Sequence, residues 1–460
     1  MADERAQARA QIRGVKRAAE ADLLARKNVI GVDIGDKETD GKNTGRLAIV
    51  VFVEAKEPDS KLSAADRIPK EINGVPTDVQ QMKVVLQGPA MELVEQATPE
   101  VDTTTYTTLL GGISIGPQRS VHLDPPDVPT SGDYIFAGTL GAMVRDRSNG
   151  ATMALTNFHV ACVNNTWSVG DRMVQPSLLD GGTSANQFGS LTRATLSSDV
   201  DGAVITVDSG KATSPSVQDI GDVAGHTAAT VGAAVRKRGR TTELTYGSVV
   251  STDFTVSINY GSDVGTRTLS NQIRIQTDTS KSARFSDHGD SGSAVMDDNR
   301  NVVGLLFAGS DDGTWTFANP IQSVLDELNV DLMVALPVTR PIVRCLNSRL
   351  TVCNFTRTPA TCELATRMTA CNVSRTVICD ITRPVTCTVT RTAVCLVSRT
   401  TCTLTRSGCN TPVPGPGPVE GGQYDDGHGY GSTGEIPEAY WAGYLAALEE
   451  IDALDQPEQD

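Results

Sequence analysis

The first 338 residues contain a single cysteine, Cys162, although the chain of 460 residues has ten. One cysteine cannot form a disulfide within this part, as expected of a protein in a reducing compartment. The chain also lacks a run of ~18 consecutive apolar residues, and residues 1–5 are not a basic patch leading into an apolar core. We therefore expect no membrane helix and no standard signal peptide. These absences predict a cytoplasmic protein, with export by a non-standard route as the alternative.

Basic residues are missing from one end of the chain and concentrated just before it. Residues 411–460 contain eleven acidic residues and no Lys or Arg, whereas residues 339–409 contain ten arginines against Glu363 and Asp380. The formal net charge is −15, and Phe355 is the one aromatic residue within the basic stretch. Acidic balance and missing aromatic stacking platforms make nucleic acid an unlikely partner.

The length leaves room for several domains, and the local pattern changes several times along the chain. The predicted organisation is an N-terminal helix (1–27), a small α/β module and connector (28–132), an all-β double barrel (133–336), Cys-containing tandem repeats (337–410), a Pro/Gly-rich linker (411–434) and an acidic amphipathic helix (435–460). The fold class is therefore multidomain and mainly β. An apolar helical spacing at residues 321–328 predicts a helix that closes the barrel region.

One motif suggests chemistry. Residues 288–293 read His-Gly-Asp-Ser-Gly-Ser, which places Ser291 inside Gly-Asp-Ser-Gly. Alone, this motif is often only a turn. Upstream, however, an apolar run ends at His159, and Asp201 precedes a buried-strand pattern. The order His, Asp, Ser predicts a nucleophilic serine activated by a histidine and an acid. Asp199, two residues from Asp201, is the alternative acid.

Residues 133–336 resemble the trypsin-like (chymotrypsin-fold) serine peptidases of bacterial type. Besides the three candidate residues, residues 238–249 resemble the first strand pair of the second barrel in streptogrisin-type enzymes. Residues 68–79, followed by such a domain, are similar to bacterial relatives of the plant narrow-leaf trypsin-like proteases. The resemblance implies a double β-barrel, a serine endopeptidase acting on proteins or peptides, and no cofactor or metal.

Roles can be assigned to the candidate catalytic residues. Ser291 would attack the scissile carbonyl, His159 would take and return the proton, and Asp201 would hold the imidazole. The backbone N–H groups of Gly289 and Ser291 would form the oxyanion hole.

The resemblance also implies a substrate-binding set of five residues: Phe285, Ser286, His288, Phe307 and Gly309. Phe285 would form the floor of the primary pocket, and Gly309 would leave the pocket open. An apolar floor predicts a preference for apolar or small residues before the cleaved bond. The alternative is that Phe285 packs inside the barrel. Cys162, three residues after His159, has no partner in this region and is expected to be a buried free thiol.

The tandem repeats at 337–410 read Thr or Ser, Arg, about three residues, Cys, at a period of seven to nine. Repeated β-branched residues favour strands, and one physical arrangement is a narrow β-solenoid in which each unit supplies half a coil. Stacked coils would bring cysteines within disulfide range, and zinc binding is the competing interpretation. We expect this region to mediate self-association or the docking of a partner. The helical face at 435–454 is expected to dock on a partner or on the chain itself.

The sequence therefore predicts a serine endopeptidase with a C-terminal interaction region. Two alternatives remain. One is a structural or filament-forming protein that uses the protease-like domain as a scaffold. The other is a self-processing protease that cuts its own linker.

Overall fold

The computed structural model describes residues 2–39, 41–87, 90–94 and 102–335, together with the backbone of eight short strands between residues 343 and 404. The chain divides into two compact units, Met1–Val338 and Thr339–Asp460. Each unit is described by itself. Among the described residues, no helix combines the length and apolar character needed to cross a membrane.

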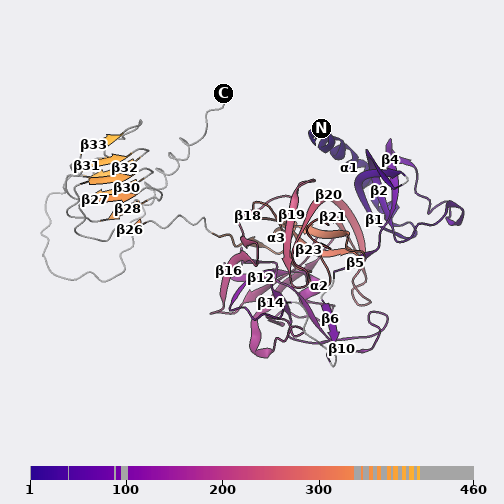
Figure 1. Cartoon of the computed structure of the whole chain (residues 1–460). Coiled ribbons are helices and arrows are strands. Elements are labelled where there is room, and N and C mark those ends of the chain that lie inside the picture. The colour runs from indigo at the N-terminus through magenta and orange to yellow at the C-terminus, as the bar shows by residue number, and fades with distance from the viewer. Residues whose placement is uncertain are drawn as a thin grey trace. The chain divides into compact units, whose positions relative to one another are not determined.

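The N-terminal module packs one helix against a small sheet (Figure 1). Its elements are α1 (Ala2–Leu24), β1 (Val29–Thr39), β2 (Lys42–Val53), the 3-10 turn η1 (Asp59–Lys61), β3 (Glu71–Ile72) and β4 (Val75–Gln81). Strands β1 and β2 form an antiparallel hairpin, and β2 pairs parallel with β4. Apolar side chains of α1, including Ile12 and Leu23, pack on Val32, Ile34 and Ile49 of the sheet.

The first barrel is built on a ten-stranded sheet in the order β25-β11-β12-β15-β14-β13-β8-β10-β6, with β9 also on β10. Its strands are β6 (Ala90–Leu93), β8 (Ser114–Pro117), β9 (Val121–Leu123), β10 (Gly132–Thr139), β11 (Ala142–Asp146), β12 (Thr152–Thr156), β13 (Arg172–Val174), β14 (Gln187–Leu196), β15 (Asp201–Val207) and β25 (Val330–Leu332). The helix α2 (Phe158–Ala161) and the 3-10 turn η3 (Ser184–Asn186) lie in its connections. A three-stranded sheet adds β7 (Thr108–Gly111), β16 (Ala212–Val217) and β17 (Gly221–Asp222).

The second barrel closes because β19 pairs with both β20 and β22 at the ends of the order β19-β22-β23-β24-β21-β20. The strands of its sheet are β5 (Val84–Leu86), β18 (Gly225–His226), β19 (Ala234–Gly239), β20 (Glu243–Asn259), β21 (Thr266–Thr277), β22 (Ala294–Asp297), β23 (Asn301–Ser310) and β24 (Trp315–Pro320). The same sheet continues through β1 into the N-terminal module, because Gly31 pairs with Val256. The module therefore shares a sheet with the second barrel.

Residues 84–123 differ from the expected connector. Strands β5 and β6 pair with β23 and β10, and β8 pairs with β10 and β13. The barrel sheets therefore recruit strands from well before residue 133. Strands of three or four residues are too short for alternation to reveal them in the sequence.

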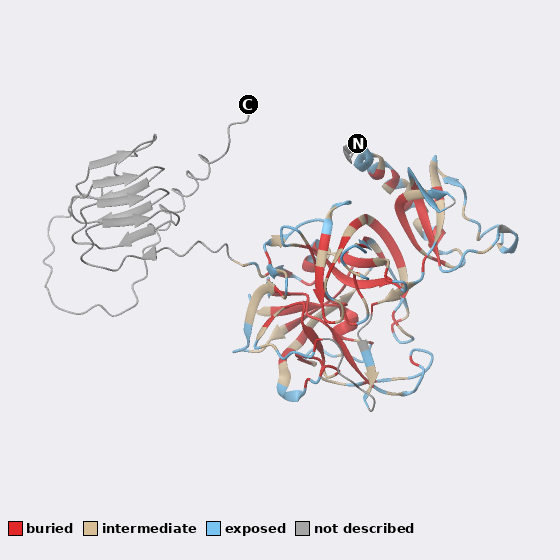
Figure 2. Cartoon of the chain, in the orientation of Figure 1, coloured by how far each residue is buried: buried red, intermediate tan, exposed pale blue. Residues whose placement is uncertain are grey.

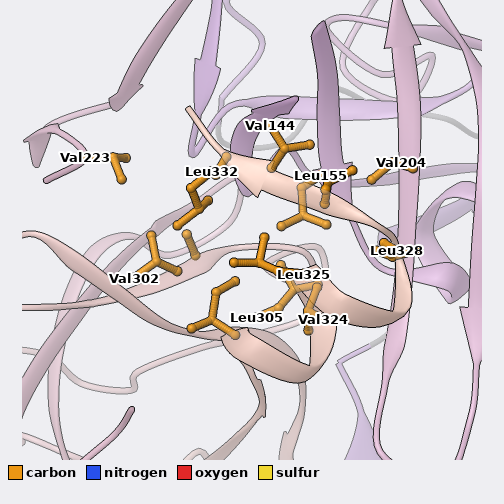
Figure 3. Packing of buried hydrophobic residues seen from close by; sticks show 14 of the residues in the cluster. Val144, Leu155, Val204, Val223, Val302, Leu305, Val324, Leu325, Leu328 and Leu332 are labelled. Atoms are coloured by element: carbon orange, nitrogen blue, oxygen red, sulfur yellow. The ribbon is translucent and has the colours of Figure 1, made fainter. Parts of the chain in front are cut away.

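One hydrophobic cluster joins the two barrels beneath the helix α3 (Ile321–Glu327) (Figure 3). Val144 and Leu155 come from the first barrel, and Leu305 comes from the second. Val324 and Leu325 of α3 are completely buried between them. Buried residues fill the interior of both barrels (Figure 2). The mainly β, chymotrypsin-like fold predicted for this region is thereby confirmed, and the two barrels are held in a fixed relation.

The second unit contains two parallel four-stranded sheets, β26-β28-β30-β32 and β27-β29-β31-β33. The strands are β26 (Val343–Arg344), β27 (Val352–Phe355), β28 (Ala360–Glu363), β29 (Ala370–Val373), β30 (Val377–Ile381), β31 (Thr386–Val389), β32 (Ala393–Val397) and β33 (Thr401–Leu404). Each strand pairs with the second strand along, and cysteines occupy equivalent positions, as in the pairing of Cys371 with Cys387. The predicted linker at 411–434 and helix at 435–460 lie outside the described residues.

Candidate functional site

His159 and Asp201 meet because their elements follow paired strands. His159 lies on α2, directly after β12, and Asp201 is the first residue of β15, which pairs with β12. The Nδ1 of His159 lies 2.5 Å from Oδ2 of Asp201. The side-chain amide of Asn157 donates to the Asp201 carbonyl oxygen over 2.7 Å and ties the two segments together. Both ring and carboxylate are buried, at 2% and 0% exposure.

Tyr260 is a third member of this cluster that the sequence did not reveal. Its hydroxyl donates to Asp201 Oδ2 over 2.9 Å, at the oxygen that also faces His159. Burial, together with the negative charge of Asp201, raises the pKa of Tyr260 well above its usual value, so the hydroxyl stays protonated and can donate. The rival acid, Asp199, instead accepts from the side chain of Asn271 over 3.3 Å.

Ser291 lies on the turn that leads into β22. Its carbonyl oxygen accepts from the N–H of Thr139 in the first barrel, over 2.9 Å, so the turn is anchored across both barrels. Its hydroxyl donates to the carbonyl oxygen of Gln87, and the Phe307 carbonyl oxygen lies 3.2 Å from the same Oγ. Among the described residues, the Nε2 of His159 is buried without a hydrogen-bond partner. The hydroxyl of Ser291 is thus turned toward Gln87 in this structure.

Gly289 gives the turn before Ser291 its shape. Its φ is +93°, a conformation that residues with a side chain rarely adopt, and an added Cβ would lie 2.5 Å from Thr241 Oγ1. In the described part of the chain, no hydrogen bond is made by the backbone N–H groups of Gly289 and Ser291. Two backbone donors on a concave turn beside a serine are the arrangement that stabilises a carbonyl oxygen as it gains negative charge.

Asp290 holds this turn in place through an ion pair and hydrogen bonds. Its ion-pair partner, Lys237, is a residue that sequence reasoning missed. Lys237 Nζ lies 3.2 Å from Asp290 Oδ2, and both side chains are fully buried. Asp290 also accepts from the backbone N–H groups of Thr241 and Thr242, over 2.9 and 3.1 Å. Burial lowers the pKa of Lys237, while the charge of Asp290 opposes that shift. The ion pair therefore ties the turn to β19.

Four of the five residues expected to bind substrate are buried, and only His288 is exposed. The ring of Phe285 is completely buried in the hydrophobic cluster of the second barrel with Val249 and Ile275, so the packing alternative describes it best. The hydroxyl of Ser286 lies 2.7 Å from that of Thr316. Phe307 is also buried, and Gly309 pairs with Val85 of β5.

An open hollow of about 420 Å³ lies next to His159. Its walls include His288, which is exposed, and Tyr260 from the second barrel. His122 and Asp127 contribute from the first-barrel side. The structure therefore brings His288 to the same site as His159, as expected from its place in the motif.

Cys162 is a buried free thiol, as expected. Burial raises its pKa, with the nearby charge of Asp201 acting in the same direction. A thiol in that state is a poor nucleophile. In the portion the structure describes, no three His, Cys, Asp or Glu side chains gather as a metal site.

Comparison with known proteins identifies the domain. Residues 149–328 match the family model described as Trypsin. No curated protein matches the chain. The bounds of the match include His159, Asp201 and Ser291.

Several solved structures are similar in fold. Protease A of Thermobifida fusca is 21% identical with a TM-score of 0.35, and the similarity covers 50% of this chain and 100% of that one. The Nocardiopsis protease is 19% identical with a TM-score of 0.36, over 49% and 100%. Cellulomonas bogoriensis chymotrypsin is 21% identical with a TM-score of 0.34, over 50% and 100%. At these identities and TM-scores the likeness is one of fold alone. The similarity to plant narrow-leaf proteases stays a prediction. By the family match, the chain contains a serine endopeptidase domain of the trypsin family.

Proposed function

We propose that Ser291, His159 and Asp201 are the catalytic triad of this endopeptidase and that the N–H groups of Gly289 and Ser291 form its oxyanion hole. The observation that carries the proposal is the 2.5 Å contact between His159 Nδ1 and Asp201 Oδ2. That contact leaves Nε2 as the ring nitrogen available to the serine, and it is the nitrogen without a partner. Asp201 holds the tautomer and stabilises the imidazolium that forms.

The reaction then proceeds through an acyl-enzyme. Ser291 Oγ attacks the substrate carbonyl carbon while its proton passes to His159, and the negative charge develops within reach of the two N–H groups. His159 returns the proton to the leaving amine. Water completes the cycle by the same steps in reverse. Tyr260 and Asn157 position Asp201 and touch no reacting atom.

The test is labelling of the purified full chain with a fluorophosphonate, which reacts with activated serines. We expect labelling to depend on Ser291 and to disappear in Ser291→Ala and His159→Ala. The matched control is Ser280→Ala, an exposed serine whose hydroxyl bonds Asp278. Hydrolysis of a peptide library should fall by about 10⁴-fold or more in the two triad variants. Hydrolysis that persists in Ser291→Ala would refute the triad.

We also propose that the chain acts in the cytoplasm, which its sequence favours.

We further propose that residues 337–410 mediate self-association. The support is the parallel register of the repeat strands, in which Cys353 pairs with Cys371 and Cys379 with Cys395. Parallel stacks present unpaired edges to a further copy. Sedimentation of the full-length Ser291→Ala chain should show oligomers that do not depend on protease activity. A monomer at all concentrations would contradict self-association.

A further inference from the structure

Residues 84–87 of the chain itself lie in the active site. Strand β5 lies antiparallel to the end of β23, with Leu86 opposite Ala308 and Val85 opposite Gly309. Strand β6 lies antiparallel to β10 of the other barrel. Figure 1 shows β5 beside β23 and β6 beside β10. Addition of an extended segment to a sheet edge is a common way to bind a peptide.

The backbone of Gln87 is held at the nucleophile. Its N–H donates to the Phe307 carbonyl oxygen over 3.3 Å, and its own carbonyl oxygen accepts from the Ser291 hydroxyl. The carbonyl carbon of Gln87 is bonded to that oxygen and is therefore next to Ser291 Oγ.

The side chain of Gln87 is enclosed. The residue is 3% exposed, and its Oε1 is buried without a hydrogen-bond partner among the described residues. Its Nε2 passes 2.6 Å from the position that a Cβ on Gly309 would occupy. A glutamine in an ordinary connector keeps its amide in water. The missing Cβ of Gly309 therefore makes the space that this amide fills.

The segment also closes the site to other substrates. Ser291 is 0% exposed and His159 is 2% exposed. An endopeptidase that acts on other proteins needs a reachable nucleophile, so the occupant must leave or be cut first. In the described part of the chain, His159 Nε2 and the backbone N–H groups of Gly289 and Ser291 make no hydrogen bond, so all three remain available to the reaction.

We propose that residues 84–87 hold the first substrate bond of this protease and that Ser291 cleaves the peptide bond that follows Gln87 in its own chain. This inference rests on the proposed triad. It adds a self-processing site upstream of the catalytic domain, distinct from the C-terminal linker, and it assigns glutamine as a residue that the primary pocket accepts.

The chemistry balances with one water molecule. Ser291 Oγ bonds to the Gln87 carbonyl carbon, and its proton passes to His159. The bond from that carbon to the Gly88 nitrogen breaks, and the nitrogen takes the proton. Water then adds to the acyl carbon, gives a proton back to Ser291 through His159, and leaves a carboxylate at Gln87.

The two products remain associated. Residues 1–87 stay paired with the barrel through β1 and β20. Arg274 Nε also donates to the buried Asp33 carboxylate over 2.9 Å. Cleavage must therefore be detected on the denatured protein, in which the two fragments separate.

The experiment is intact-mass analysis of the denatured full-length protein over time. We expect wild type to yield a fragment ending at Gln87 and one beginning at Gly88, and Ser291→Ala to stay whole. A Ser291→Ala chain mixed with wild type should also stay whole, because cleavage occurs within one chain. Gln87→Glu should slow cleavage more than about 10-fold, because a carboxylate in this enclosed space has no partner. Gln81→Glu adds the same charge at an exposed residue of β4 and should not slow it.

Other outcomes separate this inference from the triad itself. Ser291-dependent fluorophosphonate labelling of a wild-type chain that stays whole would overturn the cleavage and leave the triad standing. A whole chain that is labelled only after Leu86→Asp loosens β5 would also overturn cleavage, since the segment would then be an inhibitor. No labelling of wild type or of Leu86→Asp would refute the triad.

Discussion

Tyr260 donates its hydroxyl hydrogen to Asp201 over 2.9 Å, at the carboxylate oxygen that also faces His159. The two residues are 59 positions apart, and Tyr260 comes from the second barrel while Asp201 comes from the first. The site is therefore complete only when the barrels are joined. A hydrogen bond to a buried carboxylate is stronger than one between neutral groups.

We expect Tyr260→Phe to lower kcat by roughly 10- to 150-fold, since a bond to a charged group contributes about 1.5–3 kcal/mol. KM for peptide substrates should change little, because the hydroxyl bonds Asp201. Tyr134→Phe is the matched control, since its hydroxyl bonds the backbone of Thr130. Steady-state kinetics of both variants provide the measurement. An equal loss of kcat in Tyr134→Phe would show that both substitutions act by destabilising the fold, and not through the hydrogen bond to Asp201.

The turn at Gly289 allows a separate test of the oxyanion hole. Gly289→Ala places a methyl group 2.5 Å from Thr241 Oγ1, at a φ of +93°. We expect kcat to fall about 10²- to 10³-fold, as when one oxyanion donor is lost. Gly170→Ala is matched in backbone strain, with a φ of +99°, but its Cβ would meet nothing within 4 Å.

Both alanine variants should lose stability in urea unfolding, because both force a side chain into the left-handed region, and Gly289→Ala should lose at least as much because its Cβ also meets Thr241. Only Gly289→Ala should lose catalysis. If Gly170→Ala loses as much activity, the strain itself and not the shape of the turn is responsible.

The sequence predicted the mainly β double-barrel fold because short alternating runs and turns are local signals. It also singled out His159, Asp201 and Ser291, since each lies in a short recognisable motif. Lys237 was missed because Val-Arg-Lys-Arg-Gly looks like a polar strand face, and its partner Asp290 is 53 residues away. Gln87 was missed because its contact with Ser291 spans 204 residues. Contacts across such distances depend on which strands become neighbours in a sheet, and the pattern of one short strand does not show its partner.

The buried pair of Lys237 and Asp290 should be costly to break. Lys237→Met leaves the Asp290 carboxylate buried without its counter-ion, and we expect the free energy of unfolding to fall by about 3–5 kcal/mol. Lys281→Met removes an ammonium from an exposed ion pair with Asp278, with side chains 57% and 31% exposed. Its urea midpoint should be nearly unchanged. A similarly small effect in Lys237→Met would show that the hydrogen bonds donated to Asp290 by Thr241, Thr242 and Asp287 are enough to hold the turn.

Asp102 forms another buried ion pair, and its stability contribution depends on pH. Its Oδ2 lies 2.7 Å from Arg238 Nη1, and Oδ1 accepts from the Thr104 N–H over 3.1 Å. Burial alone would raise the pKa of Asp102, but the hydrogen bonds from Arg238 and Thr104 outweigh it and lower that pKa. The folded chain therefore binds a proton at Asp102 less readily than the unfolded chain does.

Because the pKa of Asp102 is lower in the folded chain than in the unfolded chain, the direction of the pH dependence of stability follows. The contribution of Asp102 to stability is fully present above its unfolded pKa of about 3.9 and is lost as pH falls through the lower folded pKa. We expect wild type to exceed Asp102→Asn in free energy of unfolding by a constant amount near neutral pH, and the difference to shrink below about pH 4. Urea titrations from pH 7 to pH 3 measure it. A difference that is the same at every pH would mean that the substitution acts through lost packing and not through the charge on Asp102.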